Sequence, residues 1–178
     1  KYLMPKKLWE PSKGLIKNSN LFAYEKFISK YYKYNLSRNY TKLLKWSVKN
    51  PKDFWNSIWK YFEVIGIKTN KFKLTKDLIN SKFFVNSKLN FTENLLVKNS
   101  NQKAITFVSE NGYREQKSWK ELNIDVKKII TFYKKINICE KDRIAAYTPN
   151  QIETVECFLS ASAIGSIWSS CSPDFGVH

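Results

Sequence analysis

Residues 143–176 constrain this chain more than any other stretch, because they predict a strand, a helix and a second strand in close succession. Ile144 to Tyr147 is a short apolar run with the length of a strand that is buried on both faces. The helix that follows ends at Gly165, since glycine just past the last apolar position is a helix stop signal. Ile167 then begins a second apolar run. So short a crossover predicts a right-handed βαβ unit in a parallel sheet.

Polar residues mark the start of that helix. Pro149 ends the first strand, Asn150 is a favourable N-cap, and Glu153 stands where a capping-box carboxylate would reach back. The apolar residues that then recur at helical spacing are Ile152, Val155, Phe158, Leu159 and Ala163.

A β-hairpin and a long helix are predicted before this unit. Residues 104–108 and 113–117 read as strands, and Asn111 with the glycine after it supplies a two-residue turn that tolerates positive φ. Ser118 then caps a helix, with Glu121 as its capping-box partner. The order of hairpin, helix, strand, helix and strand predicts an α/β domain.

The front of the chain predicts helices with aromatic faces. Residues 1–20 read as an extended arm, and helices are predicted over residues 21–34, 40–50 and 51–65. Rings spaced three and four apart lie on one helix face, which favours core packing over the alternative of stacking against nucleic-acid bases. Residues 67–80 are polar and rich in lysine, and we expect a loop there.

A polar cluster stands in the apolar segment 89–96. Asn90, Glu93 and Asn94 could form a polar site, but capping and bracing of a buried segment is the favoured interpretation. In that interpretation Asn90 or Thr92 starts a short helix. The apolar residues expected inside are Leu89, Phe91, Leu95 and Leu96.

The net charge of +16 raises the question of nucleic-acid binding. Residues 1–100 hold 21 basic and 6 acidic residues, whereas residues 101–178 hold 10 and 9. Of the 31 basic residues only Arg38, Arg114 and Arg143 are arginine, and readers of nucleic acid favour the bidentate arginine fork. A solvated, lysine-rich surface is therefore favoured over a basic nucleic-acid-binding module.

The cysteines and the hydropathy of the chain indicate the cellular compartment in which the protein is expected. Cys139, Cys157 and Cys171 are odd in number and have no CxxC spacing, so neither a disulfide framework nor a zinc site is predicted. No apolar run approaches the roughly 20 residues of a membrane span. We expect no membrane partner and a cytoplasmic location.

Two motifs near the end of the chain carry a resemblance to a known family. They are Y-x-P-N-x-x-E at residues 147–153 and A-x-G-S-I-W-S-S-C-S-P-D-F-G at residues 163–176. They resemble the acetoacetate–CoA ligases of the AMP-forming acyl-adenylate superfamily, and residues 168–176 are the most specific part.

Further motifs extend this resemblance over nearly the whole chain. W-x-P-S begins at Trp9, L-x-x-W-S-V-x-x-P-x-x-F-W-x-x-x-W begins at Leu43, and F-F-x-x-x-x-L-N-F-x-E-N-L-L begins at Phe83. The resemblance implies an N-terminal arm and helical region over residues 1–100. It also implies the start of an AMP-binding α/β domain over residues 101–178, with the opening hairpin and βαβ units of an incomplete large domain.

The resemblance implies a two-step ligation. Acetoacetate attacks the α-phosphate of ATP, giving an acyl-adenylate and pyrophosphate, and the thiol of CoA then displaces AMP. The full-length enzyme would use ATP, CoA and Mg²⁺. The superfamily's Ser/Thr/Gly-rich loop ending in Pro-Lys does not occur here, and neither GxxxxGK[ST] nor GxGxxG is present. We therefore expect no catalytic residue and no metal ligand in this chain, and no tight binding of ATP or CoA.

The candidate site residues follow the second predicted strand. Ligands of open α/β sheets gather at the carboxyl ends of the strands, and in relatives the equivalent turn lies beside the pantetheine arm of CoA. Asp174, Phe175 and Gly176 are therefore the CoA-proximal candidates. The alternative is that Pro173 and Gly176 shape a turn and Phe175 plugs a core. Trp168 is expected in the core.

Both ends of the chain suggest a fragment, since it begins at Lys1 and ends at Val177 and His178 directly after a predicted loop. We expect no role for His178. Within the enzyme class, the alternative is a fragment of a related short-chain acyl-CoA synthetase that acts on acetate or propionate.

Overall fold

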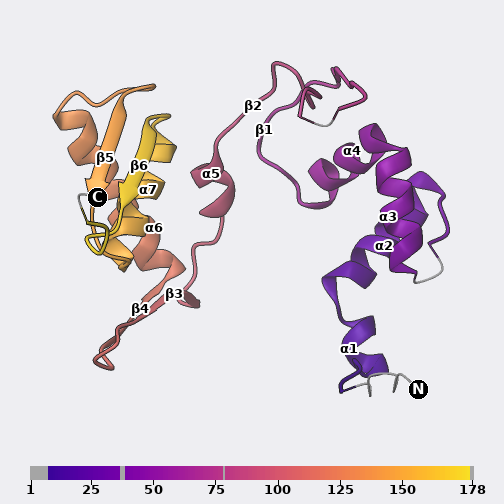
Figure 1. The fold of residues 1–178 in the computed structure, drawn as a ribbon, viewed down its shortest axis with the longest axis horizontal. Helices are drawn as coiled ribbons and strands as arrows, with labels where there is room; N and C mark the ends of the chain where they lie inside the picture. Colours follow the sequence, from indigo (N-terminus) through magenta and orange to yellow (C-terminus); the bar gives the residue numbers. More distant parts are fainter. Residues whose placement is uncertain (1–7, 37–38, 78, 177–178) are drawn as a thin grey trace. The chain divides into compact units, whose positions relative to one another are not determined.

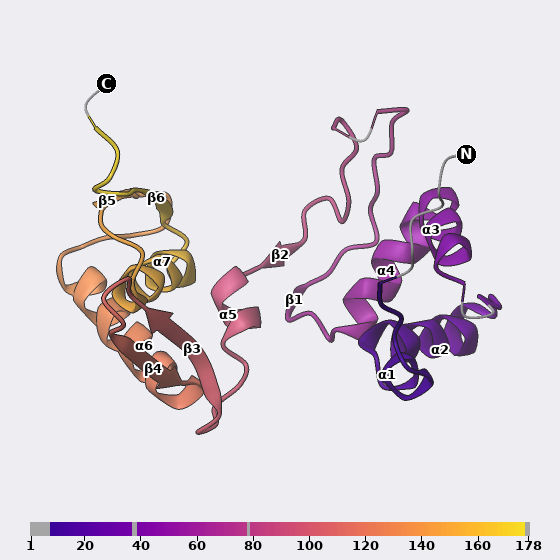
Figure 2. The same ribbon diagram turned by 60° about the horizontal axis from the view of Figure 1, so that its bottom comes forward.

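The computed structural model describes residues 8–36, 39–77 and 79–176, and it divides into two compact units. The first, here called the helical unit, holds the described residues up to 64 together with 69–86. The second, here called the α/β unit, holds residues 65–68 and the described residues from 87 onward. Figures 1 and 2 show the elements of each unit.

Four helices build the helical unit, and three of them begin at a side chain that accepts a backbone N–H. Ser12, Ser19 and Asn39 are these N-caps. The helices are α1 (Lys13–Lys17), α2 (Asn20–Tyr32), α3 (Tyr40–Lys49) and α4 (Pro51–Tyr61). The prediction of an extended arm over residues 1–20 is wrong in part, because Ser12 starts a single helical turn there. Residues 1–7 lie outside the described residues.

The core of the helical unit lies where α2, α3 and α4 meet. Its buried residues are Tyr24, Ile28, Leu36, Leu43 and Trp46. The Tyr24 hydroxyl and Ser57 Oγ are 2.5 Å apart and buried, so α2 and α4 share a hydrogen bond inside the core.

The predicted end of the third helix is wrong. The helix α4 stops at Tyr61 rather than continuing to Ile65, because Glu63 adopts positive φ. Phe62 and Ile65 are consequently exposed. The segment 69–86 then packs aromatic rings on α4, with Trp55 against Phe83.

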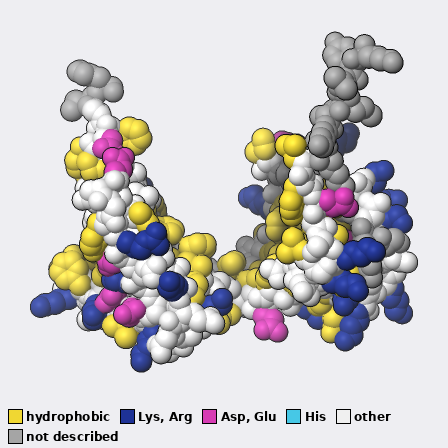
Figure 3. Space-filling model, turned by 90° about the horizontal axis from the view of Figure 1, so that it is seen from below, with side chains coloured by type: hydrophobic (Ala, Val, Ile, Leu, Met, Phe, Trp, Pro, Cys, Tyr) yellow, Lys and Arg dark blue, Asp and Glu magenta, His cyan; other side chains and the backbone are white. Residues whose placement is uncertain are grey.

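Basic side chains, dark blue in Figure 3, stand on the visible part of the helical unit among larger uncharged and hydrophobic areas. The described residues of this unit contribute lysines only. Several of them cover aromatic rings, and Lys60 Nζ lies 3.8 Å from the centroid of Tyr31. Lys26, Lys30 and Lys60 thus lie over aromatic rings at the surface of this unit.

The α/β unit follows the predicted order. In chain order its elements are β1 (Gly66–Ile67), β2 (Lys88–Leu89), α5 (Phe91–Leu95), β3 (Lys103–Val108), β4 (Arg114–Ser118), α6 (Trp119–Lys135), β5 (Arg143–Tyr147), α7 (Ile152–Ala163) and β6 (Ile167–Cys171). The strands pair as antiparallel β1 with β2, antiparallel β3 with β4, and parallel β5 with β6. The expected α/β fold class is confirmed.

The helix α5 is capped and braced by asparagines, as predicted. Asn90 Oδ1 accepts the Glu93 N–H, and Asn90 Nδ2 donates to the carbonyls of Ser162 and Ala163 at the end of α7. The buried Thr92 hydroxyl donates to the Leu159 carbonyl at 2.7 Å.

The prediction that the apolar neighbours of these asparagines turn inward is wrong for most of them. Leu89, Phe91 and Leu95 are exposed, while Leu96 packs against the core of the α/β unit. The five-residue α5 contacts α7 through Thr92 and through the Phe91 ring, whose centroid lies 5.9 Å from that of Phe158. Most of its apolar surface is left uncovered by the described residues.

The hairpin and the capping box of α6 form as predicted, with one difference. Ser118 Oγ accepts the Glu121 N–H, and the Glu121 carboxylate accepts the Ser118 N–H. The hairpin loop has three residues rather than two, because Ser109 N–H bonds to the Tyr113 carbonyl and Gly112 adopts φ 84° between them.

The parallel pair β5 and β6 is joined through α7, as the spacing predicted. The core beneath it contains Leu122, Val126 and Leu159, from α6 and α7. Burial of the strands on both faces is wrong for this chain. Alternate residues of β5 are exposed, and in β6 every residue except Trp168 is exposed, because the described residues supply a sheet of only two strands here.

Candidate functional site at the carboxyl edge of the parallel strands

The carboxyl ends of β5 and β6 lie side by side, because Tyr147 is the register partner of Cys171. The loop after β5 and the turn after β6 therefore leave the same edge of the sheet (Figure 1). The Thr148 N–H donates to the Cys171 carbonyl at 3.1 Å and extends the pairing past the strands. This edge is where ligands of open α/β sheets bind.

The turn after β6, residues 172–176, is closed by its own hydrogen bonds. Ser172 Oγ donates to Asp174 Oδ2 at 2.7 Å and accepts the Asp174 N–H at 3.2 Å. The Phe175 N–H donates to the Ser172 carbonyl at 3.2 Å. The Asp174 carboxylate is thus partly occupied by its neighbour, and the turn holds its shape without a deep core.

The three predicted CoA-proximal residues lie together and are exposed. The Phe175 side chain is 71% exposed, so it plugs no core among the described residues. A Cβ at Gly176 would meet no heavy atom within 4 Å, so its lack of a side chain leaves open backbone rather than relieving a clash. The relation of Asp174, Phe175 and Gly176 to CoA stays a prediction.

The loop after β5 differs from its prediction. Gln151 rather than Asn150 is the N-cap of α7, and its side chain makes no capping bond, so the proposed capping box of Asn150 and Glu153 is wrong. Threonines shape the loop instead. Thr154 Oγ1 donates to the Pro149 carbonyl at 2.8 Å and lies 2.9 Å from Thr148 Oγ1.

Two residues that the sequence did not single out as functional support this edge. The Tyr147 hydroxyl donates to the Pro173 carbonyl at 3.0 Å and so connects β5 to the turn after β6. Trp168 is half-buried, with its ring centroid 6.4 Å from that of Phe158 on α7. Tyr147 stands first in the Y-x-P-N-x-x-E motif, but its bond to the Pro173 carbonyl follows from the register of β5 with β6, which the sequence does not signal.

An ion network beneath the sheet joins β4, α6 and α7. Lys117 Nζ lies 2.6 Å from Glu156 Oε1 and 2.8 Å from Asp125 Oδ2, and Lys128 bonds the other oxygen of Asp125 at 2.8 Å. The side chain of Glu156 is only 4% exposed. This network ties α7 to β4 and α6 through side-chain ion pairs.

Burial and hydrogen bonding shift the pKa values of the groups in this network. Burial raises the pKa of Glu156, and the nearby Lys117 ammonium offsets this only in part. Hydrogen bonds from Lys117 and Lys128 lower the pKa of Asp125. Burial acts to lower the pKa of Lys117, but its bonds to both carboxylates outweigh burial and raise that pKa. Lys117 is therefore a structural cation rather than a poised base.

The residues that the structure describes include no candidate metal site and no candidate membrane span. They contain no group of three or more His, Cys, Asp or Glu side chains placed to hold a metal ion. No helix among them has both the length and the apolar character needed to cross a bilayer. His178 lies outside the described residues.

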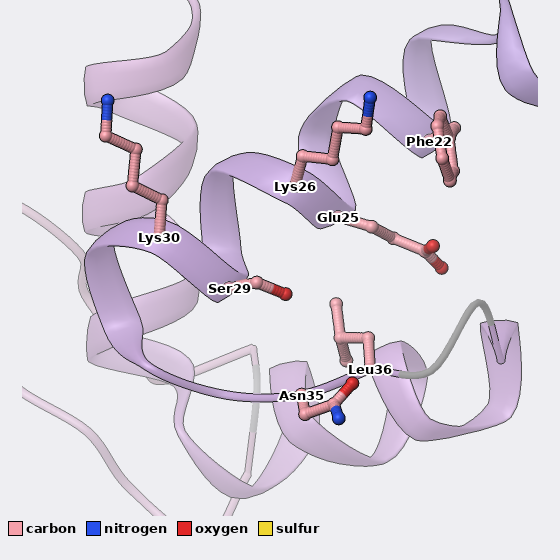
Figure 4. A pocket seen from close by; sticks show the side chains of 7 residues that line it. All are labelled: Phe22, Glu25, Lys26, Ser29, Lys30, Asn35 and Leu36. Atoms are coloured by element: carbon pink, nitrogen blue, oxygen red, sulfur yellow. The ribbon is translucent and has the colours of Figure 1, made fainter.

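A hollow of about 550 Å³ opens in the helical unit beside α2 (Figure 4). The Glu25 carboxylate points into it above Leu36, while the ammonium groups of Lys26 and Lys30 point away from it. One carboxylate with Ser29, Asn35 and Leu36 around it is not a convergent set of catalytic groups, and we assign the hollow no role.

Comparison with known proteins agrees with the resemblance seen in the sequence motifs. A family model for the acetyl-coenzyme A synthetase N-terminus matches residues 40–95. The chain is 32% identical over 170 residues to an acetoacetyl-coenzyme A synthetase of Rhizobium meliloti, which covers 95% of this chain and 26% of that relative. An acetoacetyl-CoA synthetase of Xenopus tropicalis is 37% identical over 79% of this chain and 22% of the relative. The chain thus spans about a quarter of the length of these curated relatives.

A solved structure shows the same fold. The acetoacetyl-CoA synthetase of Streptomyces lividans matches 97% of this chain and 27% of its own chain, with a TM-score of 0.86 at 24% identity. The resemblance to acetoacetate–CoA ligases is therefore confirmed in sequence and in fold. A malonamoyl-CoA synthetase of Penicillium aethiopicum is also similar, at 29% identity over 96% of this chain.

Proposed function

We propose that this chain is the N-terminal part of an AMP-forming acetoacetate–CoA ligase. The observation that carries the proposal is the similarity to acetoacetyl-CoA synthetases over as much as 97% of the chain. Residues 1–100 would supply the N-terminal arm and helical region, and residues 101–178 would begin the AMP-binding domain. A nucleic-acid-binding module is not favoured, because the relatives are named as acetoacetyl-CoA synthetases.

The proposed reaction has two steps. A carboxylate oxygen of acetoacetate attacks the α-phosphate of ATP, and pyrophosphate leaves. The thiol of CoA then attacks the acyl carbon, loses its proton, and AMP leaves with both electrons of the broken C–O bond. Acetoacetyl-CoA, AMP and pyrophosphate are the products.

The part of this reaction that the chain serves is the approach of CoA. The turn 172–176 offers an exposed aromatic ring at Phe175 and open backbone at Gly176, which suit the narrow, partly apolar pantetheine arm. Asp174 presents the remaining acceptor capacity of its carboxylate. These residues fit a wall of a CoA channel and none of them touches the phosphate chemistry.

The described residues offer no comparable binding site for ATP or Mg²⁺. The described glycines are scattered rather than gathered in a phosphate-binding loop, and the described residues form no candidate metal group. No step is therefore assigned to this chain at the α-phosphate, and the nucleotide and metal sites are proposed to lie in the rest of the ligase.

A cytoplasmic location belongs to the proposal. Cys139, Cys157 and Cys171 are all unpaired thiols, the usual state of cysteines in a reducing compartment.

The first step can be tested alone by acid-dependent exchange of labelled pyrophosphate into ATP, using the product of the complete reading frame. We expect exchange that requires acetoacetate and is weaker with acetate, propionate or malonamate. Preference for one of these other acids would keep the ligase chemistry and change the substrate, a possibility that the malonamoyl-CoA synthetase relative makes worth testing. No exchange with any acid would overturn the proposed function.

A further inference from the structure

One side chain of β5 holds the turn that follows β6. Tyr147 is the last residue of β5, and its hydroxyl donates to the carbonyl of Pro173, two residues past the end of β6, at 3.0 Å. The ring therefore reaches along the carboxyl edge of the sheet from one strand to the turn beyond its neighbour. Its side chain is 68% exposed, so the bond is made at the surface rather than in the core.

The other hydrogen bonds of the turn do not fix where the turn points. Ser172 binds Asp174 twice and accepts the Phe175 N–H, so these contacts are internal to residues 172–175. A turn with only internal hydrogen bonds can keep its shape and still rotate as a whole about the end of the strand. The Tyr147 bond adds a contact from outside the turn and restricts that rotation.

We propose that Tyr147 is a positioning residue for CoA, which sets the direction of the turn 172–176 and thereby places Phe175 and Gly176 against the pantetheine arm. The inference rests on the proposed ligase function. Tyr147 itself is assigned no contact with a reacting atom. Its loss should therefore weaken the use of CoA in the second step and leave acyl-adenylate formation in the first step unchanged.

The experiment compares Tyr147→Phe with Tyr113→Phe in the complete ligase. Tyr113 is a matched control, because it is also an exposed tyrosine of the α/β unit whose hydroxyl makes one hydrogen bond, to Glu115, in the hairpin loop. For Tyr147→Phe we expect a rise of about three- to tenfold in the KM for CoA, the range that the loss of one such bond gives. Pyrophosphate exchange, kcat at saturating CoA and the melting temperature should match those of the control.

Each other outcome contradicts the inference in a distinguishable way. If the wild-type ligase is active and Tyr147→Phe has the same KM for CoA as the wild type, the positioning role is overturned and the proposed function stands. An equal loss of both steps together with a lowered melting temperature would make Tyr147 a purely structural residue and also overturn it. A wild-type protein that forms no thioester would remove the proposed function and this inference together.

Discussion

Among single residues, Lys117 has the clearest energetic consequence, because two carboxylates share its ammonium and one of them is buried. Glu156 lies in the interior, whereas Asp125 also bonds the exposed Lys128. Breaking a buried pair by removing one partner costs far more than losing a surface pair, since the remaining charge stays desolvated. The two lysines of one network therefore provide a test and its control.

We predict that Lys117→Met lowers the free energy of unfolding by about 2 kcal/mol or more, because Glu156 is left buried without its partner. Lys128→Met should cost about 0.5 kcal/mol or less, since Lys128 is 71% exposed. Urea unfolding followed by circular dichroism at low protein concentration measures both. Equal effects of the two substitutions would show that the burial of Glu156 does not control the network.

Asp125 predicts a pH dependence of stability. Its pKa is lowered in the folded chain by the bonds from Lys117 and Lys128, so the unfolded chain takes up this proton more readily. The carboxylate therefore stabilises the fold above its unfolded pKa of about 3.9, and this contribution is lost as the pH falls through the lower folded pKa.

Asp125→Asn should therefore lower the melting temperature most at neutral pH, and the difference from the wild type should narrow as the pH falls below about 4. Burial of Glu156 acts in the opposite direction, because its raised pKa favours the protonated folded form. Melting curves between pH 3 and pH 7 measure the balance. If the difference in melting temperature between Asp125→Asn and the wild type stays constant over this pH range, the ion pairs of Asp125 are not its cause.

Residues that act locally could be predicted, and residues that act across the fold could not. The capping box of Ser118 and Glu121 lies within four residues, so its pattern is visible in the sequence. Lys117 and Glu156 are 39 positions apart, and nothing in either neighbourhood indicates that they meet. The bond from Tyr147 to the Pro173 carbonyl depends on strand register in the same way.

At the scale of elements, the long periodic segments were predictable and the short ones were not. The hairpin, α6 and the parallel pair follow from periodicity, capping and turn residues. The single turn of α1 carries too few residues for a periodic signal, and the predicted third helix ran past Tyr61 because apolar residues continue after the backbone has left the helix. At α7, the threonine bonds of the preceding loop replaced the expected Asn150 cap.

The end of α7 supplies a test at this scale. Gly165 adopts φ +76°, and a Cβ there would lie 2.9 Å from Glu140 Cγ, so Gly165→Ala should cost about 1–2 kcal/mol of unfolding free energy. Gly176→Ala is the control, because its Cβ would meet no neighbour within 4 Å, and we expect a change of about 0.5 kcal/mol or less. Thermal unfolding compares the two. A neutral Gly165→Ala would show that the glycine is not needed to end the helix.

For the whole molecule, the exposed strands have a consequence that the sequence already suggested. The described sheet of β5 and β6 has two strands, and Tyr147, Ile167 and Phe175 around it are exposed apolar or aromatic side chains. A parallel sheet is normally covered on both faces, and an open edge invites pairing with other chains. The cover expected in the ligases is not supplied by the described residues.

We predict that the chain of residues 1–178, studied alone, shows helical circular dichroism but is marginally stable and prone to aggregate. It should bind neither ATP nor CoA tightly. Light scattering and isothermal titration with each ligand test this. A soluble monomer with a cooperative melting transition and binding on the order of –8 kcal/mol would show that these residues are a complete functional domain.

If these residues begin an AMP-forming ligase, the complete protein makes a thioester and releases AMP. The most direct test is mass spectrometry of the products formed by the complete protein with acetoacetate, ATP and CoA. We predict acetoacetyl-CoA and AMP in equal amounts. Without CoA, only the acyl-adenylate and pyrophosphate should form, and without acetoacetate no product should form. Release of ADP in place of AMP, or the absence of any thioester with acetoacetate and with the other short acids, would contradict the assignment to this ligase family.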